Sequence, residues 1–146
     1  MNIPKSGQKI LTDLIVNIKS ETVLVDRPVA KVFDFLTDFN NFEKLMPDQV
    51  VKWSSDKNSG RFTIKDMAEI GMRIEEVNED QYVLITSDGK VPFEFKLRVN
   101  LEKVGEGQTA VEIDFDGQVG AMIAMMAKRP LTNLVNHMVD SIKQYA

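Results

Sequence analysis

The chain contains no cysteine and only one histidine, His137, among its 146 residues. The lack of cysteine excludes disulfides, thiolate metal sites and cysteine nucleophiles, and it fits a reducing compartment, so we expect a cytoplasmic protein. A single histidine cannot build a multi-histidine metal site or a histidine-based triad within one chain. We therefore expect neither a metal nor another cofactor.

Long apolar runs and a strong charge of one sign are also missing. The first residues, MNIPKSGQKILTDL, lack the apolar stretch of a signal peptide, and no other stretch stays apolar for long enough to cross a bilayer. The net charge is −4, and the acidic and basic residues are interspersed without a basic stripe that could gather phosphates. These observations argue against integral membrane association and against nucleic acid as a partner.

What the chain does have is the composition of an ordinary soluble domain, with 43% hydrophobic and 27% charged residues. A domain of this size buries roughly two thirds of the surface that its unfolded chain exposes, which is enough for a core and an internal pocket. We expect one domain over residues 1–146, in which residues 1–13 form an N-terminal extension that the pattern does not place.

Strand signals dominate the middle of the chain, between Gln49 and Val119. The clearest are residues 93–101 and 111–119, in which apolar and polar residues alternate. Alternation of this kind predicts an antiparallel sheet with one covered apolar face and one face toward water. The other predicted strands are residues 14–25, with an irregularity near 19–21, and residues 49–55, 61–66, 70–75 and 82–87.

Two short helices are expected between the first and second of these strands. Residues 26–28, Asp-Arg-Pro, are typical of a helix start, because aspartate caps free amides and proline lacks only a donor that the first turn does not use. The second helix, residues 40–46, buries Phe42 and Leu45 and is stopped by Pro47.

A long helix is expected at the end of the chain, over residues 121–145. Its apolar stripe, which must cover the sheet, consists of Leu131, Leu134, Val135, Met138, Ile142 and Tyr145. Extended backward without a break, that face would carry Ile123, Ala124 and Ala127 and would leave Met122, Met125 and Met126 pointing away. We prefer a kink at Pro130 that turns these methionines inward, because the proline ring disfavours a helical Arg129 and removes a backbone donor.

The order of these elements, with the segments VDRPVAKVFDFLTDFNNFEKLMP and GAMIAMMAKRPLTNLV, resembles the START/SRPBCC superfamily, close to its bacterial polyketide-cyclase-like members. The resemblance covers the chain from about Leu14 onward. It implies an α+β helix-grip fold, β-α-α-β6-α, in which a curved antiparallel sheet of about seven strands wraps around a long C-terminal helix. It also implies a cavity for lipids, sterols, polyketides or other apolar small molecules, and it offers no enzymatic motif to carry over.

The candidate reactive groups have plainer interpretations. His137 falls near the polar flank of the last helix, where an exposed histidine is the simpler interpretation. Glu75 and Glu76, like Asp114 and Asp116, resemble paired carboxylates that could serve acid–base chemistry or hold a hard cation. Strand alternation instead makes the two aspartates outward-facing, solubilising charges.

The residues best suited to line the cavity are inward side chains of the sheet and methionines of the last helix. Methionine is flexible and polarisable, and apolar pockets bury most of a small ligand's surface. Plain core packing is the alternative for each of these residues. The predicted lining residues are Phe62, Ile64, Met72, Phe93, Phe95, Leu97, Phe115, Met122, Met125, Met126, Leu134 and Met138.

These observations predict the binding or transport of a hydrophobic small molecule, which would be the partner of the protein, without covalent chemistry. One alternative is a cyclase- or dehydrase-like enzyme that takes an acid or base from Asp66, Glu69 or Tyr82. Another is an interaction module, in which the methionines near the start of the last helix stay exposed and dock a partner, a second copy or a membrane surface.

Overall fold

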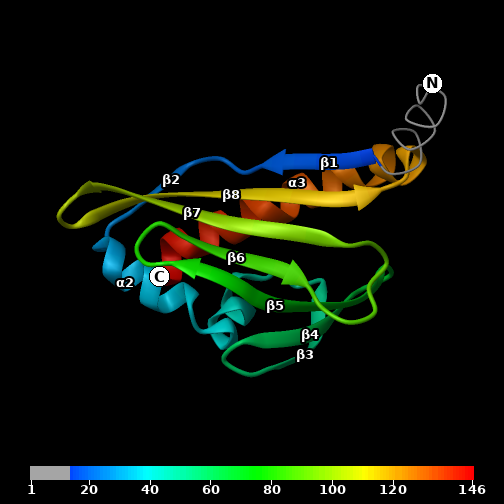
Figure 1. Ribbon diagram of the computed structural model, residues 1–146, viewed down its shortest axis with the longest axis horizontal. Coiled ribbons are helices and arrows are strands. Elements are labelled where there is room, and N and C mark those ends of the chain that lie inside the picture. Colours follow the sequence, from blue (N-terminus) through cyan, green and yellow to red (C-terminus); the bar gives the residue numbers. More distant parts are fainter. Residues whose placement is uncertain (1–13) are drawn as a thin grey trace, which may run out of the picture.

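The computed structural model describes residues 14–146, and it confirms the expected α+β architecture (Figure 1). Within these residues an antiparallel sheet of eight strands has the order β1-β8-β7-β6-β5-β4-β3, and β2 also pairs with β8. The elements are β1 (Leu14–Lys19), β2 (Val23–Val25), α2 (Val29–Leu36), η1 (Phe39–Leu45), β3 (Val50–Ser55), β4 (Ser59–Ile64), β5 (Ala68–Asn78), β6 (Tyr82–Ser87), β7 (Phe95–Gly105), β8 (Gln108–Val119) and α3 (Ala121–Tyr145).

The first predicted strand is divided into β1 and β2, at the position where an irregularity was expected. Ser20 lies in the break, and its N–H donates to the carbonyl of Ile113 at 2.8 Å while its hydroxyl accepts from the Ile113 N–H at 2.8 Å. Both strands then pair with β8, so that Leu14 lies opposite Val119. This division explains why the sheet has eight strands rather than about seven.

The two short helices lie where they were expected, but the first is not capped as predicted. Pro28 is the N-cap of α2, and it offers no side-chain cap. The carboxylate of Asp26 instead accepts a hydrogen bond from Gln108 Nε2 at 3.0 Å, so the predicted capping role of Asp26 is wrong. The second helix, η1, is a 3-10 helix whose N-cap Asp38 accepts from the Asn40 N–H at 3.0 Å.

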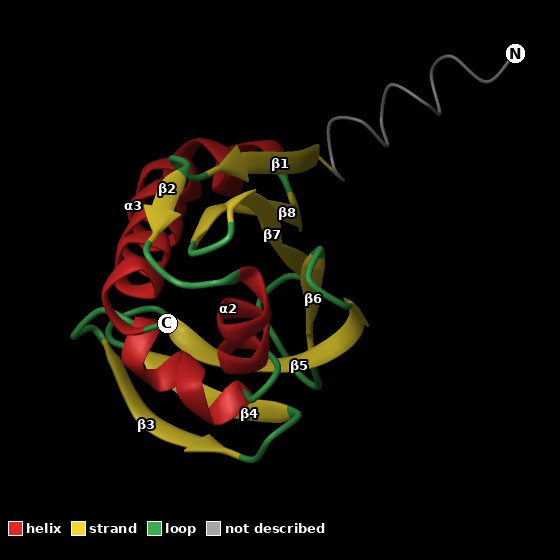
Figure 2. Cartoon of the chain, turned by 90° about the vertical axis from the view of Figure 1, so that its left-hand side faces the viewer, coloured by secondary structure: helices red, strands yellow, loops and turns green. Residues whose placement is uncertain are grey.

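The sheet curves around the helices and encloses the apolar core (Figure 2). α3 packs against β1, β2, β8 and η1, while α2 covers β6, β7 and β8. Along β7 and β8 buried residues alternate with more exposed ones, and Phe42 and Leu45 of η1 are fully buried as predicted. This arrangement confirms the helix-grip fold.

Stacked aromatic rings fill the space between η1 and the β3–β4 hairpin. Phe39 stacks on Phe42 with ring centroids 4.8 Å apart, and on Trp53 at 5.6 Å. Trp53 stacks in turn on Phe62 at 5.1 Å. Stacked, buried rings contribute beyond the area that they bury, so this part of the grip is firmly packed.

α3 runs from Ala121 to Tyr145 with Pro130 inside it, and the predicted inward turn of its methionines is wrong. Ala124 is 7% exposed, whereas Met125 is 85% and Met126 is 75% exposed. A helix turns by about 100° per residue, so a helix that continues through Pro130 with Ala124 against the sheet carries the next two side chains toward solvent. The side chain of Met122 lies outside the described residues.

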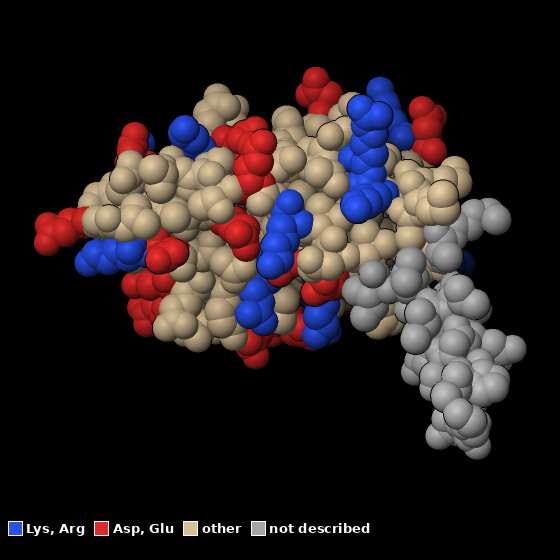
Figure 3. Space-filling view, turned by 90° about the horizontal axis from the view of Figure 1, so that it is seen from above, with Lys and Arg blue, Asp and Glu red and all other residues tan. Residues whose placement is uncertain are grey.

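The outer surface is polar and mixed in charge. Figure 3 shows acidic and basic side chains interspersed over one face of the molecule. Asn17 Nδ2 donates to a carboxylate oxygen of Asp114 and of Asp116, at 2.7 Å each, which fits the outward-facing positions predicted for these aspartates. Within residues 14–146, no helix combines the length and the apolar character that crossing a bilayer requires.

Candidate ligand site

A groove of about 610 Å³ opens between α3 and the adjoining ends of η1, β3 and β4. Small-molecule sites typically occupy roughly 300–1,000 Å³, so the groove is large enough for a ligand. Its lining comes from segments that are far apart in the sequence. The lining residues are Pro47, Asp48, Gln49, Val50, Ile64, Lys65, Met67, Pro130, Leu131, Asn133, Leu134 and His137.

One wall of the groove is a flank of α3. At about 100° per residue, Pro130, Asn133, Leu134 and His137 project from one side of the helix, next to the stripe that packs on the sheet. Leu134 is half-buried and His137 is exposed, as expected for a flank between the buried and the solvent-facing sides. The wall is therefore apolar toward the sheet and polar toward solvent.

The opposite wall is held by main-chain contacts where β3 begins and β4 ends. Val50 pairs with Ile64, and next to this pair the Lys65 N–H donates to the Gln49 carbonyl at 2.9 Å. Asp66 then adopts a left-handed φ of 63°, and the Met67 N–H donates back to the Ile64 carbonyl at 3.0 Å. This tight turn presents Met67 at the edge of the groove.

The groove has an apolar floor and a polar rim. The floor residues, buried or half-buried, are Val50, Ile64, Leu131 and Leu134. The rim residues, exposed to solvent, are Asp48, Lys65, Asn133 and His137. Burial of apolar surface stabilises a complex by about 25 cal/mol per Å², whereas a polar group left at the rim keeps its water. The arrangement suits an apolar molecule with one polar end.

The structure brings two of the predicted lining residues, Ile64 and Leu134, to this groove. Phe93 is half-buried and meets Phe95 edge-on, with ring centroids 6.0 Å apart. Met125 and Met126 point to solvent. The predicted residues that lie in the packed core instead are Phe62, Met72, Phe95, Leu97, Phe115 and Met138.

The sequence did not predict two parts of the groove, namely the segment between η1 and β3 and the β4–β5 turn. Alternation shows which face of a strand is apolar, but it does not show where the ends of separate elements meet. Pro47, which ends η1, and the exposed Met67 were the available signals in this region.

The residues named for the enzyme alternative do not line the groove. Asp66 is exposed in the β4–β5 turn, and Glu69 accepts from Arg61 Nε at 2.7 Å. The hydroxyl of Tyr82 donates to the carboxylate of Glu76, and this hydrogen bond raises the pKa of Tyr82. The contacts of Glu69 and Tyr82 and the exposure of Asp66 make these side chains parts of the surface outside the groove.

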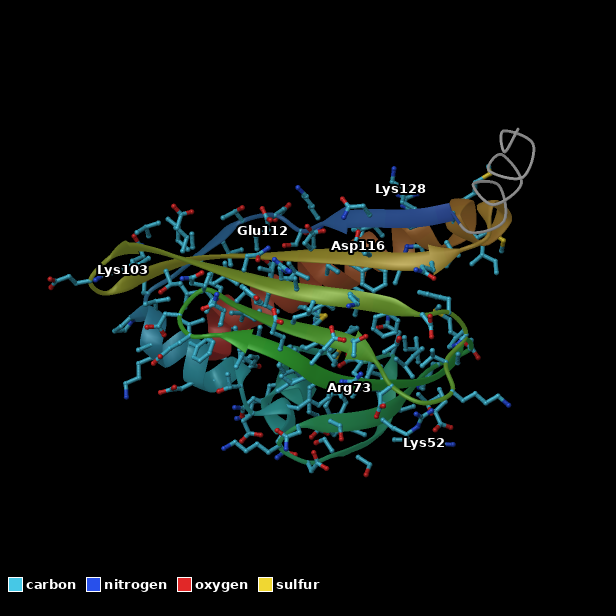
Figure 4. The ribbon with its side chains drawn as sticks, viewed as in Figure 1. Lys52, Arg73, Lys103, Glu112, Asp116 and Lys128 are labelled. Atoms are coloured by element: carbon cyan, nitrogen blue, oxygen red, sulfur yellow. The ribbon has the colours of Figure 1, made fainter. Side chains whose placement is uncertain are left out.

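A second hollow, of about 420 Å³, lies on the outer face of the sheet and is mostly polar. Arg73 on β5 and Asp116 on β8, both labelled in Figure 4, contribute to it. Its cations have partners, because Arg73 Nε lies 3.7 Å from Asp88 and Lys96 Nζ lies 3.1 Å from Glu75. In the part of the chain that the structure describes, no group of three or more His, Asp or Glu residues is arranged to hold a metal ion.

A family model described as polyketide cyclase/dehydrase and lipid transport matches residues 19–146. The chain belongs to this family. Membership confirms the resemblance to the START/SRPBCC superfamily, because the match extends from the end of β1 through α3. None of the curated proteins matches the chain by sequence.

Solved structures with the same fold include an enzyme, a protein described by its superfamily and a protein described only by its name. Norcoclaurine synthase from Thalictrum flavum superimposes with a TM-score of 0.73 at 11% identity, covering 94% of this chain and 89% of its own. A START superfamily protein from Mycobacterium smegmatis gives 0.64 at 15% identity, with 90% and 99% covered. The protein XoxI from Bacillus cereus gives 0.69 at 12% identity, with 88% and 94% covered. At these identities the likeness concerns the fold alone.

Proposed function

We propose that this member of the polyketide cyclase/dehydrase and lipid transport family binds or carries a hydrophobic small molecule, such as a lipid or a sterol-like or polyketide-like compound. The molecule is held in the groove along α3 without a covalent bond. The observation that carries this proposal is the groove itself, with about 610 Å³ of space, an apolar floor and a polar rim. The family description, which names lipid transport beside cyclase and dehydrase chemistry, supports the same class of ligand.

The first contacts of the ligand are with Ile64 and Leu134, which come from opposite walls of the groove. A longer ligand reaches further only by displacing side chains that now fill the core. Met72 and Met138 suit such a role, because an unbranched thioether changes rotamer easily and tolerates irregular shapes. The buried phenylalanines of the predicted set would then form the inner wall.

Native mass spectrometry of the freshly purified protein, followed by denaturing extraction, tests the proposal. We expect a discrete added mass that disappears on denaturation and that the extract identifies as an apolar or amphiphilic compound. A mass equal to that of the bare chain, together with no competition between apolar probes for one site, would contradict the proposal.

A variant of the groove floor sharpens the test. Leu134→Asp places a charge on the apolar floor and should weaken binding of the uncharged dye N-phenyl-1-naphthylamine by about tenfold or more, since burying one leucine is worth roughly 1.5–3 kcal/mol. Leu24→Asp, at an exposed position on β2 outside the groove, is the matched control and should bind the dye as the wild type does. Equal dye affinity for the two variants would mean that the dye binds outside the groove.

Catalysis in the same groove is the second candidate, and His137 is the observation that favours it. Histidine can accept and release a proton near neutral pH, and this one lies in the wall of the groove. Norcoclaurine synthase from Thalictrum flavum, which shares the fold, is described in complex with dopamine and hydroxybenzaldehyde. If the protein converts its extracted ligand, His137→Gln should abolish the product mass while the ligand still binds. Conversion that is unaffected by His137→Gln would exclude this role.

A further inference from the structure

Exposed apolar side chains gather at the end of the molecule where α3 begins. Met125 and Met126 are the most exposed, Ile123 is 54% exposed, and Met67 in the β4–β5 turn is 57% exposed. Figure 1 places the start of α3 and the β4–β5 turn at the same end of the molecule. Single exposed apolar residues are common, but several that lie together mark a surface that meets another apolar phase.

Basic residues alternate with these methionines around α3. At about 100° per residue, the order around the exposed side of the helix is Lys128, Met125, Arg129, Met126. Lys128 and Arg129 are exposed, and the chain contains no acidic residue between Ala121 and Val139, although its net charge is −4. Across the groove, Asp48 and Asp66 are offset only in part by Lys65, so the excess of positive charge beside the groove lies on the helix.

The chemistry of this arc of helix fits a lipid surface better than a protein. A stable protein interface covers about 800 Å² on each partner, whereas this arc consists of a few side chains. Apolar side chains that enter the headgroup region, flanked by lysine and arginine that reach lipid phosphates, are typical of helices that lie at a membrane interface.

We propose that the first turns of α3 dock the protein on the surface of an anionic lipid bilayer. Ile123, Met125 and Met126 enter the headgroup region, and Lys128 and Arg129 contact the phosphates. Met126 lies one helical turn from Pro130, which lines the groove, so the docked orientation holds the groove beside the bilayer surface. The docking surface shares none of the apolar floor of the groove, and it therefore goes beyond the proposed binding of a small molecule.

Flotation of the full-length protein with lipid vesicles tests this inference. We expect binding to phosphatidylcholine vesicles that contain phosphatidylglycerol, weaker binding at high salt, and little binding to phosphatidylcholine alone. Lys128→Gln combined with Arg129→Gln should weaken binding by about 25-fold, on the basis of roughly fivefold for each cation. Met125→Asp combined with Met126→Asp should abolish flotation, because carboxylates replace the inserted side chains. Thermal unfolding should show that both double variants remain folded, as expected for exposed positions.

Val104→Asp is the matched control. Val104 is 47% exposed in the β7–β8 hairpin, next to Lys103, which Figure 4 shows at the opposite tip of the molecule from α3's first turns. This variant should float as the wild type does. Equal binding to neutral and anionic vesicles would overturn the inference, and so would unchanged binding of the methionine variant. A third contrary result is a mass that rises with protein concentration in the wild type but not in the methionine variant, which would assign the surface to a second copy of the chain. Vesicle binding is measured without a groove ligand, so its failure is distinguishable from failure of the proposed function.

Discussion

Replacing Gly71 with alanine would test the contacts through which Arg61 holds the β6–β7 connection against the sheet. Gly71 lies opposite Arg61 in the β4–β5 pair, and a Cβ at this position would collide with Arg61 Nη1 and with the Asp88 carbonyl oxygen. The same guanidinium donates to the carbonyls of Asp88 at 3.1 Å and Lys90 at 3.0 Å. The added methyl group therefore has to displace the arginine, the connection, or both.

We expect Gly71→Ala to destabilise the fold by about 2–4 kcal/mol. Forced movement of packed groups costs about 1–3 kcal/mol. Weakened hydrogen bonds from Arg61 add about 1 kcal/mol, at the low end of the range for a charged donor, because its side chain is 39% exposed. Equilibrium unfolding in urea measures the change, and the fluorescence of Trp53, the single tryptophan, reports it.

Gly107→Ala is the matched control, since a Cβ there meets nothing within 4 Å. It should change the free energy of unfolding by less than about 0.5 kcal/mol. Arg61→Ala should remove part of the collision, so the double variant with Gly71→Ala should lose less stability than the sum of the single variants by more than about 0.5 kcal/mol. A loss below about 0.5 kcal/mol for Gly71→Ala, or strict additivity in the double variant, would refute the reasoning.

Three further outcomes follow from the same structure. Met138→Ala removes a fully buried side chain and should lower the free energy of unfolding in urea by about 2–5 kcal/mol. Met125→Ala, on the exposed side of α3, should change it by less than about 0.5 kcal/mol. Similar losses for the two variants would contradict the difference in their burial. The backbone N–H groups of Asn58 and Ser59 donate to the carboxylate of Asp56 and lower its pKa. These hydrogen bonds therefore stabilise the fold fully above the pKa of Asp56 in the unfolded chain, and the stabilisation is lost as the pH falls through the lowered pKa of the folded state. An NMR titration should place Asp56 below the ordinary aspartate value of 3.8, and an unshifted titration would count against these bonds. Tyr82→Phe should leave dye binding in the groove unchanged, because the Tyr82 hydroxyl donates to Glu76 outside the groove. Weaker dye binding would support a role for Tyr82 at the ligand site, as the enzyme alternative requires.

The order of elements could be predicted because the signals for it are local. Alternation is a property of neighbouring residues, and β6 spans Tyr82–Ser87 as its pattern predicts. α3 likewise spans Ala121–Tyr145, the range expected from the sequence. The break between β1 and β2 was also visible as an irregularity, although the hydrogen bonds of Ser20 to Ile113 could not be predicted because they join positions far apart in the chain.

The groove could be predicted only in part, because it forms where distant segments meet. Ile64 and Leu134 were named from their faces, but strand and helix patterns do not state how far along each element a hollow opens. The predicted inward orientation of Met125 and Met126 was wrong for a related reason. Pro130 removes one helical hydrogen bond, but the direction of a side chain depends on which face the whole helix buries, and Ala124 takes that face.

The side chains on the inner face of α3 explain why its first turns are packed less tightly than its last turns. In the C-terminal half the inward residues are large, and Val135, Met138 and Ile142 are fully buried against the sheet and η1. In the first turns the inward positions are Ala124 and Ala127, which fill much less space. Short inward side chains leave less apolar surface to bury, so the first turns gain less from packing than the last turns do. The groove lies along the middle turns, from Pro130 to His137, between the thinly packed and the tightly packed parts of the helix. An apolar ligand can therefore be admitted there while the buried C-terminal turns preserve the fold.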